Sequence, residues 1–249
     1  MPDLTIITIT YNDFDGISKT VVSINENISG SNLDVEVIIV DGCADLCFWS
    51  PQMVHLSKQN LKYLNGPDRG IFHAMNKGIR TSSDTGFVFF LNSGDCFYEQ
   101  NTLRLIDHLL KGSESKIIAG KVQLSYGERV AYTDLKPWVC HQAAFVKVAI
   151  LKEYEFDETF SFFGDLNLWS QLKRKSLFEP HRIDNTISRF ALGGVGNSPN
   201  YLWLRYRERS RIKSGLIRVV FRTIRVMYHF SVYKIIGAEA YYKILSKVK

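Results

Sequence analysis

The sequence contains neither of the glycine-rich loops that identify most nucleotide-binding folds. After the first apolar run it reads TYNDFDG where a dinucleotide fold needs G-x-G-x-x-G, and G-x-x-x-x-G-K-[ST] is absent. Redox dinucleotide cofactors and ATP hydrolysis by the usual phosphate loop are therefore not expected. The chain also lacks an uncharged apolar run of the roughly 18–20 residues that cross a bilayer, and its start, MPDL, does not have the pattern of a signal peptide. We therefore expect a protein that stays in the cytoplasm.

Cysteine is scarce, at four in 249 residues, which fits free thiols in a reducing compartment. A structural zinc site needs four ligands at ordered spacing. The first two cysteines lie four residues apart, but neither His55 nor His141 completes such a pattern. Metal–thiolate binding is therefore the weaker interpretation, and small buried thiols are the stronger one. The four residues are Cys43, Cys47, Cys96 and Cys140.

Short β-branched runs alternate with segments of helical spacing through the first hundred residues. This alternation predicts βαβ units and an α/β fold with a mostly parallel sheet. Ligands bind to such sheets at the carboxyl ends of the strands. The expected strands are residues 4–10, 35–40, 61–64 and 86–91, and the expected helices are residues 16–28, 50–59 and 70–80.

Polar residues follow each of the four predicted strands, so all of them should line one edge of the sheet. The segments are Thr10-Tyr11-Asn12, Asp41-Gly42, Gly66-Pro67-Asp68-Arg69 and Asn92-Ser93-Gly94-Asp95. Together they predict a nucleotide crevice, although Asp and Gly also simply punctuate turns. Without a glycine-rich cradle, a diphosphate needs a divalent cation to offset its charge. Asp95 is the expected anchor, and its hard oxygens suit Mg²⁺ or Mn²⁺.

Six motifs in order give the chain a recognisable pattern between residues 4 and about 196. They are IITITYN, IIVDG, GPDRGIFHAMNKGI, FLNSGD, FGDLNLW and SRFALGGV. The chain resembles family 2 glycosyltransferases of the GT-A fold, particularly the branch with colanic-acid and other surface-polysaccharide transferases. The resemblance implies a catalytic domain over residues 1–198, with a nucleotide half to about 98 and an acceptor half beyond it. Residues 199–249 would form a basic helical extension.

The resemblance assigns a nucleotide-sugar role to most of these polar residues. Asp41 would bond the base edge, and Asp95 would be the last residue of the metal motif. Many relatives carry several carboxylates in that motif, but here only Asp95 is present, which implies weaker metal binding. A solvated helix face is an equal interpretation of Lys77. The remaining implied nucleotide-sugar residues are Thr10, Tyr11, Asn12, Asp68, Arg69, Asn76, Lys77, Asn92, Ser93, Gly94 and, with Gly193 and Gly194 in a diphosphate loop, Arg189.

Asp165 matches the catalytic base of the family, although Gly164 replaces the acid that usually precedes it. A carboxylate there would take the proton of an acceptor hydroxyl in a one-step, inverting displacement. The alternative is a capping role for Asp165 at a predicted helix over 166–175. His141 and Gln142 follow a predicted strand and match a block that the resemblance places on the acceptor or phosphate side, while a structural role for His141 stays open.

The charge of the chain is unevenly distributed. Residues 205–249 contain twelve Lys and Arg against two Glu, so the rest is acidic although the whole chain carries +6. One predicted helical face is apolar and another is basic, which is typical of a helix that lies on an anionic membrane. Packing against the catalytic domain or a second subunit is the alternative, and no motif supports nucleic-acid binding. The apolar face has Ile217, Val220, Phe221, Ile224 and Met227; the basic face has Arg218, Arg222, Arg225 and His229.

The sequence therefore predicts a glycosyltransferase that uses a UDP- or GDP-sugar and a lipid-linked saccharide acceptor in surface-polysaccharide biosynthesis, at the cytoplasmic membrane face. A sugar nucleotidyltransferase would need a basic glycine-rich loop after the first strand, which is missing. A non-catalytic sugar-nucleotide-binding or scaffold protein is the alternative from another class, supported by the reduced metal motif. Retention of Asp165 argues against it.

Removal of the chain from Leu216 onward should leave a folded, donor-binding domain, because all six motifs precede that point. The truncated protein should no longer sediment with anionic vesicles, and added salt should weaken vesicle binding of the intact chain. Charge reversal at Arg218, Arg222 and Arg225 is the matched variant, since it exposes no apolar surface. An aggregating truncated protein, with an intact chain that ignores vesicles at low salt, would contradict the membrane interpretation.

Overall fold

The structure is a computed structural model that describes residues 1–43, 56, 60–126, 129–191 and 201–212. The predicted helix over 50–59, apart from Leu56, and the amphipathic segment 217–229 lie outside the described residues, as do Cys47, His55, Gly193 and Gly194. Among the described helices, none combines the length and apolar character that a bilayer-spanning segment requires.

The four predicted strands of the first half are confirmed within one residue at each end. They are β1 (Leu4–Thr10), β2 (Val35–Asp41), β3 (Asn60–Asn65) and β4 (Phe87–Phe90). They pair in parallel in the order β3-β2-β1-β4. Every residue of β1 and β2 is buried, as expected for strands covered on both faces.

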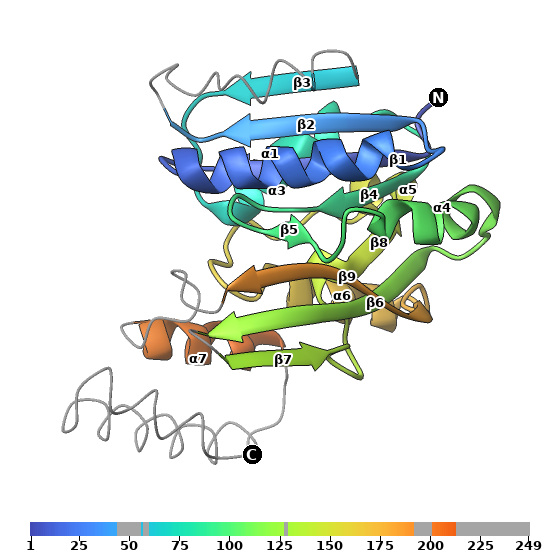
Figure 1. The fold of residues 1–249 in the computed structure, drawn as a ribbon. Helices are drawn as coiled ribbons and strands as arrows, with labels where there is room; N and C mark the ends of the chain where they lie inside the picture. Colours follow the sequence, from blue (N-terminus) through green and yellow to red (C-terminus); the bar gives the residue numbers. More distant parts are fainter. Residues whose placement is uncertain (44–55, 57–59, 127–128, 192–200, 213–249) are drawn as a thin grey trace. The chain divides into compact units, whose positions relative to one another are not determined.

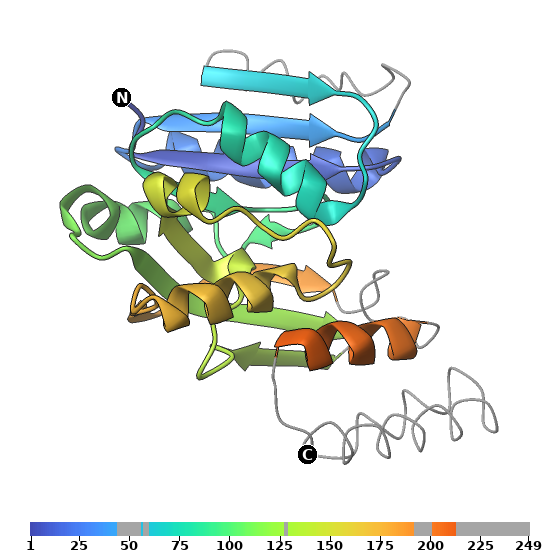
Figure 2. The same ribbon diagram turned by 180° about the vertical axis from the view of Figure 1, so that it is seen from behind.

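Helices cover both faces of this sheet. α1 (Phe14–Ser29) and α4 (Thr102–Gly112) lie on one face (Figure 1), and α3 (Ile71–Thr81), α5 (Val148–Glu153) and α6 (Gly164–Arg174) lie on the other (Figure 2). The helices predicted at 16–28 and 70–80 are thus confirmed within two residues. α3 lies so close to β1 that a Cβ added to Gly78 would be 2.5 Å from Cγ2 of Ile7.

The second half of the sheet is mixed. β8 (Ala144–Lys147) pairs antiparallel with β4 and with β6 (Ile117–Tyr126), and β9 (His181–Ala191) runs parallel to β6. β5 (Cys96–Phe97) pairs antiparallel with β9, and β7 (Arg129–Thr133) pairs antiparallel with β6. The core connects both halves: the ring of Phe89 stacks on Phe97 and Phe145, with centroids 5.3 and 4.7 Å apart. The expected α/β fold is therefore present, with its parallel strands concentrated in the first half.

The chain divides into two compact units, the smaller of which contains residues Phe160–Phe163 and the chain from Gly193 onward. Within this smaller unit, α7 (Leu202–Ile212) carries Glu208, which is only 1% exposed. Its carboxylate accepts hydrogen bonds from the backbone N–H groups of Ser161 (2.6 Å), Phe162 (2.9 Å) and Phe163 (3.1 Å). A buried charge is stable here because three donors surround it.

Substitution Glu208→Ala should lower the free energy of unfolding by about 2 kcal/mol or more, because three N–H groups lose their acceptor at once. Urea denaturation followed by far-UV circular dichroism measures this loss. Glu114→Ala removes an exposed carboxylate and serves as the control. Equal stability of the two variants would show that Glu208 does not hold this segment.

Candidate functional site

The polar segments that follow the parallel strands meet at one edge of the sheet. Register places Thr10 beside Asp41 and Asp41 beside Asn65. Backbone hydrogen bonds continue past the strand ends, from Gly42 N to Thr10 O and from Gly66 N to Asp41 O, each 3.0 Å long. The same edge receives Ser93, whose N–H donates to Ile9 O at 3.0 Å. The structure thus brings together the segments that the sequence predicts to form a crevice.

Asp41 is fully buried, and protein groups bind both of its carboxylate oxygens. Oδ1 accepts from the backbone N–H of Cys43 at 2.9 Å, and Oδ2 accepts from the hydroxyl of Tyr63 at 2.7 Å. Burial raises the pKa of Tyr63, and its bond to Asp41 raises it further, so the phenol stays a donor. Sequence reasoning missed Tyr63, and its position near the end of a parallel strand was the available signal.

At this edge of the sheet, Gly42 lies close to the side chains of Tyr11 and Asp68. A Cβ added to Gly42 would be 2.6 Å from Oδ2 of Asp68 and 3.2 Å from Cδ2 of Tyr11. The Tyr11 residue is 69% exposed, whereas Thr10 and Gly42 beside it are buried. Asn12 adopts a φ of 48° and its Oδ1 accepts from the Cys43 thiol at 2.9 Å. An exposed ring beside a glycine and a carboxylate offers a flat surface on which a base can stack.

Lys77 contacts the 66–68 segment that follows β3. Its Nζ contacts Oδ1 of Asp68 at 2.9 Å and donates to the carbonyl oxygen of Gly66 at 3.1 Å. His73, which sequence reasoning missed, has its Nδ1 3.3 Å from the same Asp68 oxygen. One turn of α3 therefore fixes the 66–68 segment.

Asn76 and Arg69 of the same 66–79 segment do not contact Asp68 but pair with residues 156–158. Asn76 is 1% exposed and pairs with the backbone of Phe156, donating from Nδ2 at 2.9 Å and accepting at Oδ1 at 3.0 Å. Its amide is thus turned to the 156–158 segment, contrary to the expectation that it opens toward the nucleoside pocket. The guanidinium of Arg69 pairs with Glu158 at 2.6 Å and remains largely exposed.

The loop before Asp95 is held by the first helix. Thr20 donates from Oγ1 to the carbonyl oxygen of Asp95 at 2.8 Å and accepts from the N–H of Gly94 at 3.0 Å. Gly94 has a φ of 87°, which favours glycine at this turn. Ser93 donates to Oδ2 of Asp13, the residue that caps α1, at 2.7 Å. The loop geometry is therefore set by side chains of α1.

Asp95 is buried to 9% exposure, and burial raises the pKa of its carboxyl group to about 6. Gln142 opposes this shift by donating from Nε2 to Oδ2 at 3.3 Å. The amide oxygen of Asn92 is also buried and has no hydrogen-bond partner in the described structure. The Asp95 carboxylate and the Asn92 amide oxygen are hard oxygen ligands of the kind that bind divalent cations. The described residues contain no cluster of three His, Cys, Asp or Glu that could bind a metal by themselves, so phosphate and water would complete its coordination.

Asp165 lies in the first turn of α6, which begins at Gly164, so it is inside the helix and not at the cap position predicted from sequence. Its Oδ2 lies 3.0 Å from Nδ1 of His141, and its Oδ1 accepts from the N–H of Leu166 at 2.7 Å. A Cβ added to Gly164 would be 2.6 Å from the ring of Phe72. This contact leaves no room for the acid that precedes the base in many relatives.

His141 and Gln142 lie in the 3₁₀ turn η1 (His141–Ala143) directly before β8. The prediction that they follow a strand is therefore wrong: the preceding residues, 134–140, form no strand. Two further residues of this site were missed from sequence. Cys140 donates its thiol to Oε1 of Gln142 at 2.9 Å, and Ser188 donates to the carbonyl oxygen of Gln142. Burial raises the pKa of the Cys140 thiol, which keeps it protonated.

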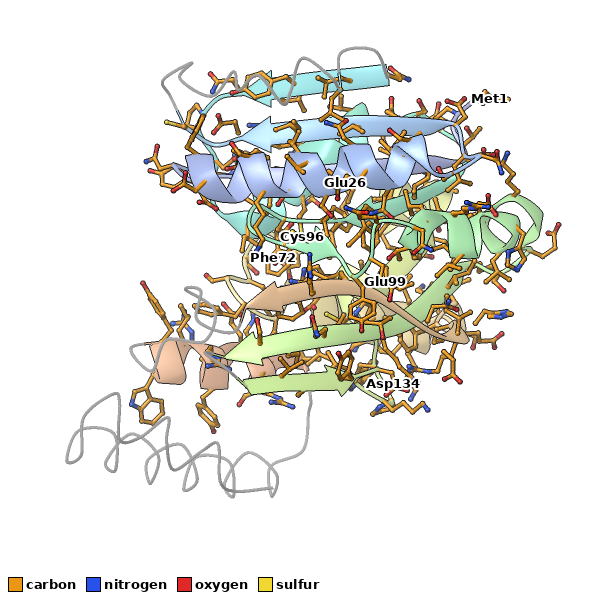
Figure 3. The ribbon with its side chains drawn as sticks, viewed as in Figure 1. Met1, Glu26, Phe72, Cys96, Glu99 and Asp134 are labelled. Carbon is orange, nitrogen blue, oxygen red and sulfur yellow. The ribbon has the colours of Figure 1, made fainter. Side chains whose placement is uncertain are left out.

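Arg189 lies on β9 beside Cys96 of β5 and lines a cleft of about 650 Å³ next to α1. Lys19, Glu26 and Glu99 line the same cleft, and Figure 3 shows the labelled Glu26, Cys96 and Glu99 between α1 and β9. Lys19 also donates to the carbonyl oxygen of Gly94 at 3.3 Å. Arg189 therefore lies near the loop of Asp95, on the side of α1.

Residues 5–167 match the sequence pattern of Glycosyl transferase family 2, and this match includes every crevice residue and Asp165. The chain belongs to glycosyltransferase family 2. It is accordingly an enzyme that transfers a glycosyl group from a nucleotide sugar.

Two sequence relatives agree with this family, and solved structures resemble the fold of the chain. Two uncharacterized glycosyltransferases of Mycobacterium tuberculosis strains are 25% identical to this chain over 245 residues. The match covers 88% of this chain and 83% of each relative. Staphylococcus aureus TarS 1–349 in complex with UDP-GlcNAc has a TM-score of 0.61 at 17% identity, covering 82% of this chain and 64% of that chain. Mannosyltransferase PcManGT from Pyrobaculum calidifontis, in complex with GDP-Man and Mn²⁺, has a TM-score of 0.57 at 13% identity. This match covers 98% of this chain and 79% of the PcManGT chain. The chain thus spans less than two thirds of the TarS structure, and these likenesses concern the fold.

Cation-dependent binding of a nucleotide sugar should weaken about tenfold for each pH unit below about 6 and stay constant above about 7. Below the pKa of Asp95 a cation has to displace a proton from the carboxyl group, whereas above it the carboxylate is free. Titration of UDP- and GDP-sugars with Mn²⁺ between pH 5 and 8 measures the effect, since these diphosphate diesters do not titrate in that range. The Asp95→Asn variant should bind weakly at every pH. A pH-independent affinity of the unmodified enzyme would contradict this assignment.

Proposed function

We propose that this family 2 enzyme is an inverting, cation-dependent transferase that uses a UDP- or GDP-sugar. It would glycosylate a hydroxyl of a lipid-linked saccharide in surface-polysaccharide biosynthesis, as in the colanic-acid branch that its motifs resemble. The observation that carries the proposal is the placement of two carboxylates. Asp95 and Asp165 each bond one of two adjacent residues, Gln142 and His141. A leaving-group side and a base side are thereby held in one site.

The nucleoside would occupy the edge formed by the ends of the parallel strands. The exposed ring of Tyr11 would stack on the base, while Gly42 permits close approach of the backbone. Asp41, with the hydroxyl of Tyr63, would form the polar wall at the base edge. Asp68, fixed by Lys77, would complete the nucleoside pocket.

The diphosphate would lie at the loop of Asp95. A divalent cation would be held by the Asp95 carboxylate and the buried oxygen of Asn92, and would offset charge on the departing diphosphate. Lys19 beside this loop adds positive charge. The complexes of TarS with UDP-GlcNAc and of PcManGT with GDP-Man and Mn²⁺ support a choice between these two bases and a cation of this type.

Asp165 would act as the general base. A sugar hydroxyl is a weak nucleophile, and a carboxylate within hydrogen-bond distance takes its proton as the new bond forms. Attack from the face opposite the leaving diphosphate inverts the anomeric carbon. The side chain of Asp165 is 23% exposed, which leaves it accessible to an acceptor. The reduced metal motif was the sequence argument for a non-catalytic binding protein, but the chain belongs to an enzyme family, and the pairing of Asp165 with His141 fits catalysis.

The lipid-linked acceptor is proposed from the charge of the sequence and from the resemblance. The basic segment beyond residue 212 lies outside the described residues. An anionic membrane surface is accordingly a proposed partner, and a second copy of the chain is the alternative for the apolar face of that segment.

A panel of UDP- and GDP-sugars tests the proposal, with Mn²⁺ or EDTA and with soluble and lipid-linked saccharide acceptors. We expect one donor to support transfer with Mn²⁺, and little transfer with EDTA. Product formed with retained anomeric configuration, or no transfer and no hydrolysis of any donor, would overturn the proposed mechanism.

Replacement of Asp165 by Asn should lower turnover by a factor of about 10² or more, because the amide cannot take the hydroxyl proton. Donor affinity should change by less than about twofold, since the two groups have the same size. Asp184→Asn is the control, because Asp184 is a fully exposed carboxylate on β9. A parallel loss of donor affinity and turnover would make Asp165 a donor-binding residue instead.

A further inference from the structure

The turn η1 connects the two carboxylates of the site through adjacent side chains. Gln142 donates to Oδ2 of Asp95 at 3.3 Å, and Nδ1 of His141 lies 3.0 Å from Oδ2 of Asp165. The two aspartates are 70 residues apart in sequence and belong to different elements. Any movement of the turn therefore changes the position of both carboxylates.

The turn itself is held from several sides. Cys140 donates to Oε1 of Gln142 at 2.9 Å, so both ends of the Gln142 amide are occupied, and the N–H of Ala143 donates to the carbonyl oxygen of Cys140 at 3.0 Å. Ser188 of β9 donates to the carbonyl oxygen of Gln142. These contacts make the turn a fixed support and not a mobile loop segment.

Helix α6 is attached to this support at two points. Trp169 donates from Nε1 to the carbonyl oxygen of Val139 at 3.1 Å, and the side chain of Asp165 contacts His141. Residues four apart lie on the same face of a helix, so both attachments fix one face of α6. Trp169 is buried and anchors the helix, which leaves His141 to set the orientation of the Asp165 carboxylate itself.

The second ring nitrogen of His141 indicates which proton it carries. Nε2 is buried and has no hydrogen-bond partner among the described residues. A proton on Nε2 would be a buried donor without an acceptor, whereas a proton on Nδ1 meets the carboxylate of Asp165. A proton on Nδ1 is therefore favoured over one on Nε2. It holds Asp165 by a hydrogen bond and leaves the negative charge of the carboxylate available to an acceptor hydroxyl.

We propose that His141 is a positioning residue that acts through Asp165, holding the base at a fixed place relative to the loop of Asp95. It would not contact phosphate or acceptor, because its free nitrogen is closed off within the protein. This refines the acceptor-side or phosphate-side role expected from sequence. It rests on the proposed role of Asp165 as the base.

Two substitutions at His141 separate this role from a general structural one. His141→Ala removes the donor and should lower kcat by about 10²-fold, the loss typical of a misplaced catalytic group. His141→Asn keeps an N–H donor near the position of Nδ1 and should retain kcat within about fivefold. The Kd of the nucleotide sugar should change by less than about twofold in both variants. His108→Ala, on the exposed side of α4, is the control.

Combination with Asp165→Asn provides the decisive measurement. If His141 acts through Asp165, the double variant His141→Ala with Asp165→Asn should be no slower than Asp165→Asn alone. Losses that multiply in the double variant would overturn the proposal, as would an Asn variant as slow as the Ala variant. A weakened donor Kd would instead indicate a phosphate contact.

Failure of this inference is distinguishable from failure of the proposed function. A slow Asp165→Asn variant together with a fast His141→Ala variant would overturn only the role of His141. Full activity of Asp165→Asn would overturn both, because there would be no base to position. Should His141→Ala fail to fold, as judged by circular dichroism, His141→Gln replaces it in the same cycle, since its amide is displaced from the Nδ1 position.

Discussion

β1 lies at the centre of the parallel half of the sheet, and its hydrogen bonds to both neighbours position the residues of the crevice. Its seven buried residues pair with β2 on one side and with β4 on the other. The pairing extends past the strand ends, where Thr10 accepts from Gly42 and Ile9 accepts from Ser93. A change in this register would move the segments at Gly42 and Ser93 together, because both are hydrogen-bonded to the same strand.

Buried carboxylates occur at several places in the protein, and their surroundings differ in a way that separates structure from function. Burial alone would raise the pKa of Glu36, but hydrogen bonds from Lys62, Ser83 and Thr5 lower it below the usual value. At Asp95, burial prevails and the pKa rises to about 6. The negative charge of Asp95 is therefore only partly balanced by neighbouring protein groups. A bound cation would balance the remainder.

The departures of the chain from the commonest pattern of its family have physical reasons in the fold. The contact between Gly164 and Phe72 places α6 against α3 and excludes a longer side chain before Asp165. The single acid that remains, Asp165, is supported by His141 on the turn before β8. In the segment after β4, Asn92 has a buried amide oxygen without a hydrogen-bond partner among the described residues. The site thus has fewer acids than is common, but each remaining acid is held by neighbours.

The local sequence was sufficient to predict the four parallel strands of the first half, helices α1, α3 and α6, and the sheet edge to which Asp41, Asp68 and Asp95 belong. Periodicity and strand ends depend on residues close together in the chain. The short motif FGDLNLW likewise singled out Asp165 as a candidate residue. The partners of these residues were not predictable: Tyr63, His73 and Cys140 were missed, and Asn76 turned toward Phe156. Such contacts join segments that are distant in sequence or depend on which way a side chain points. Only packing of the sheet against its helices decides them, and so only the tertiary structure placed the ring of His141 against Asp165.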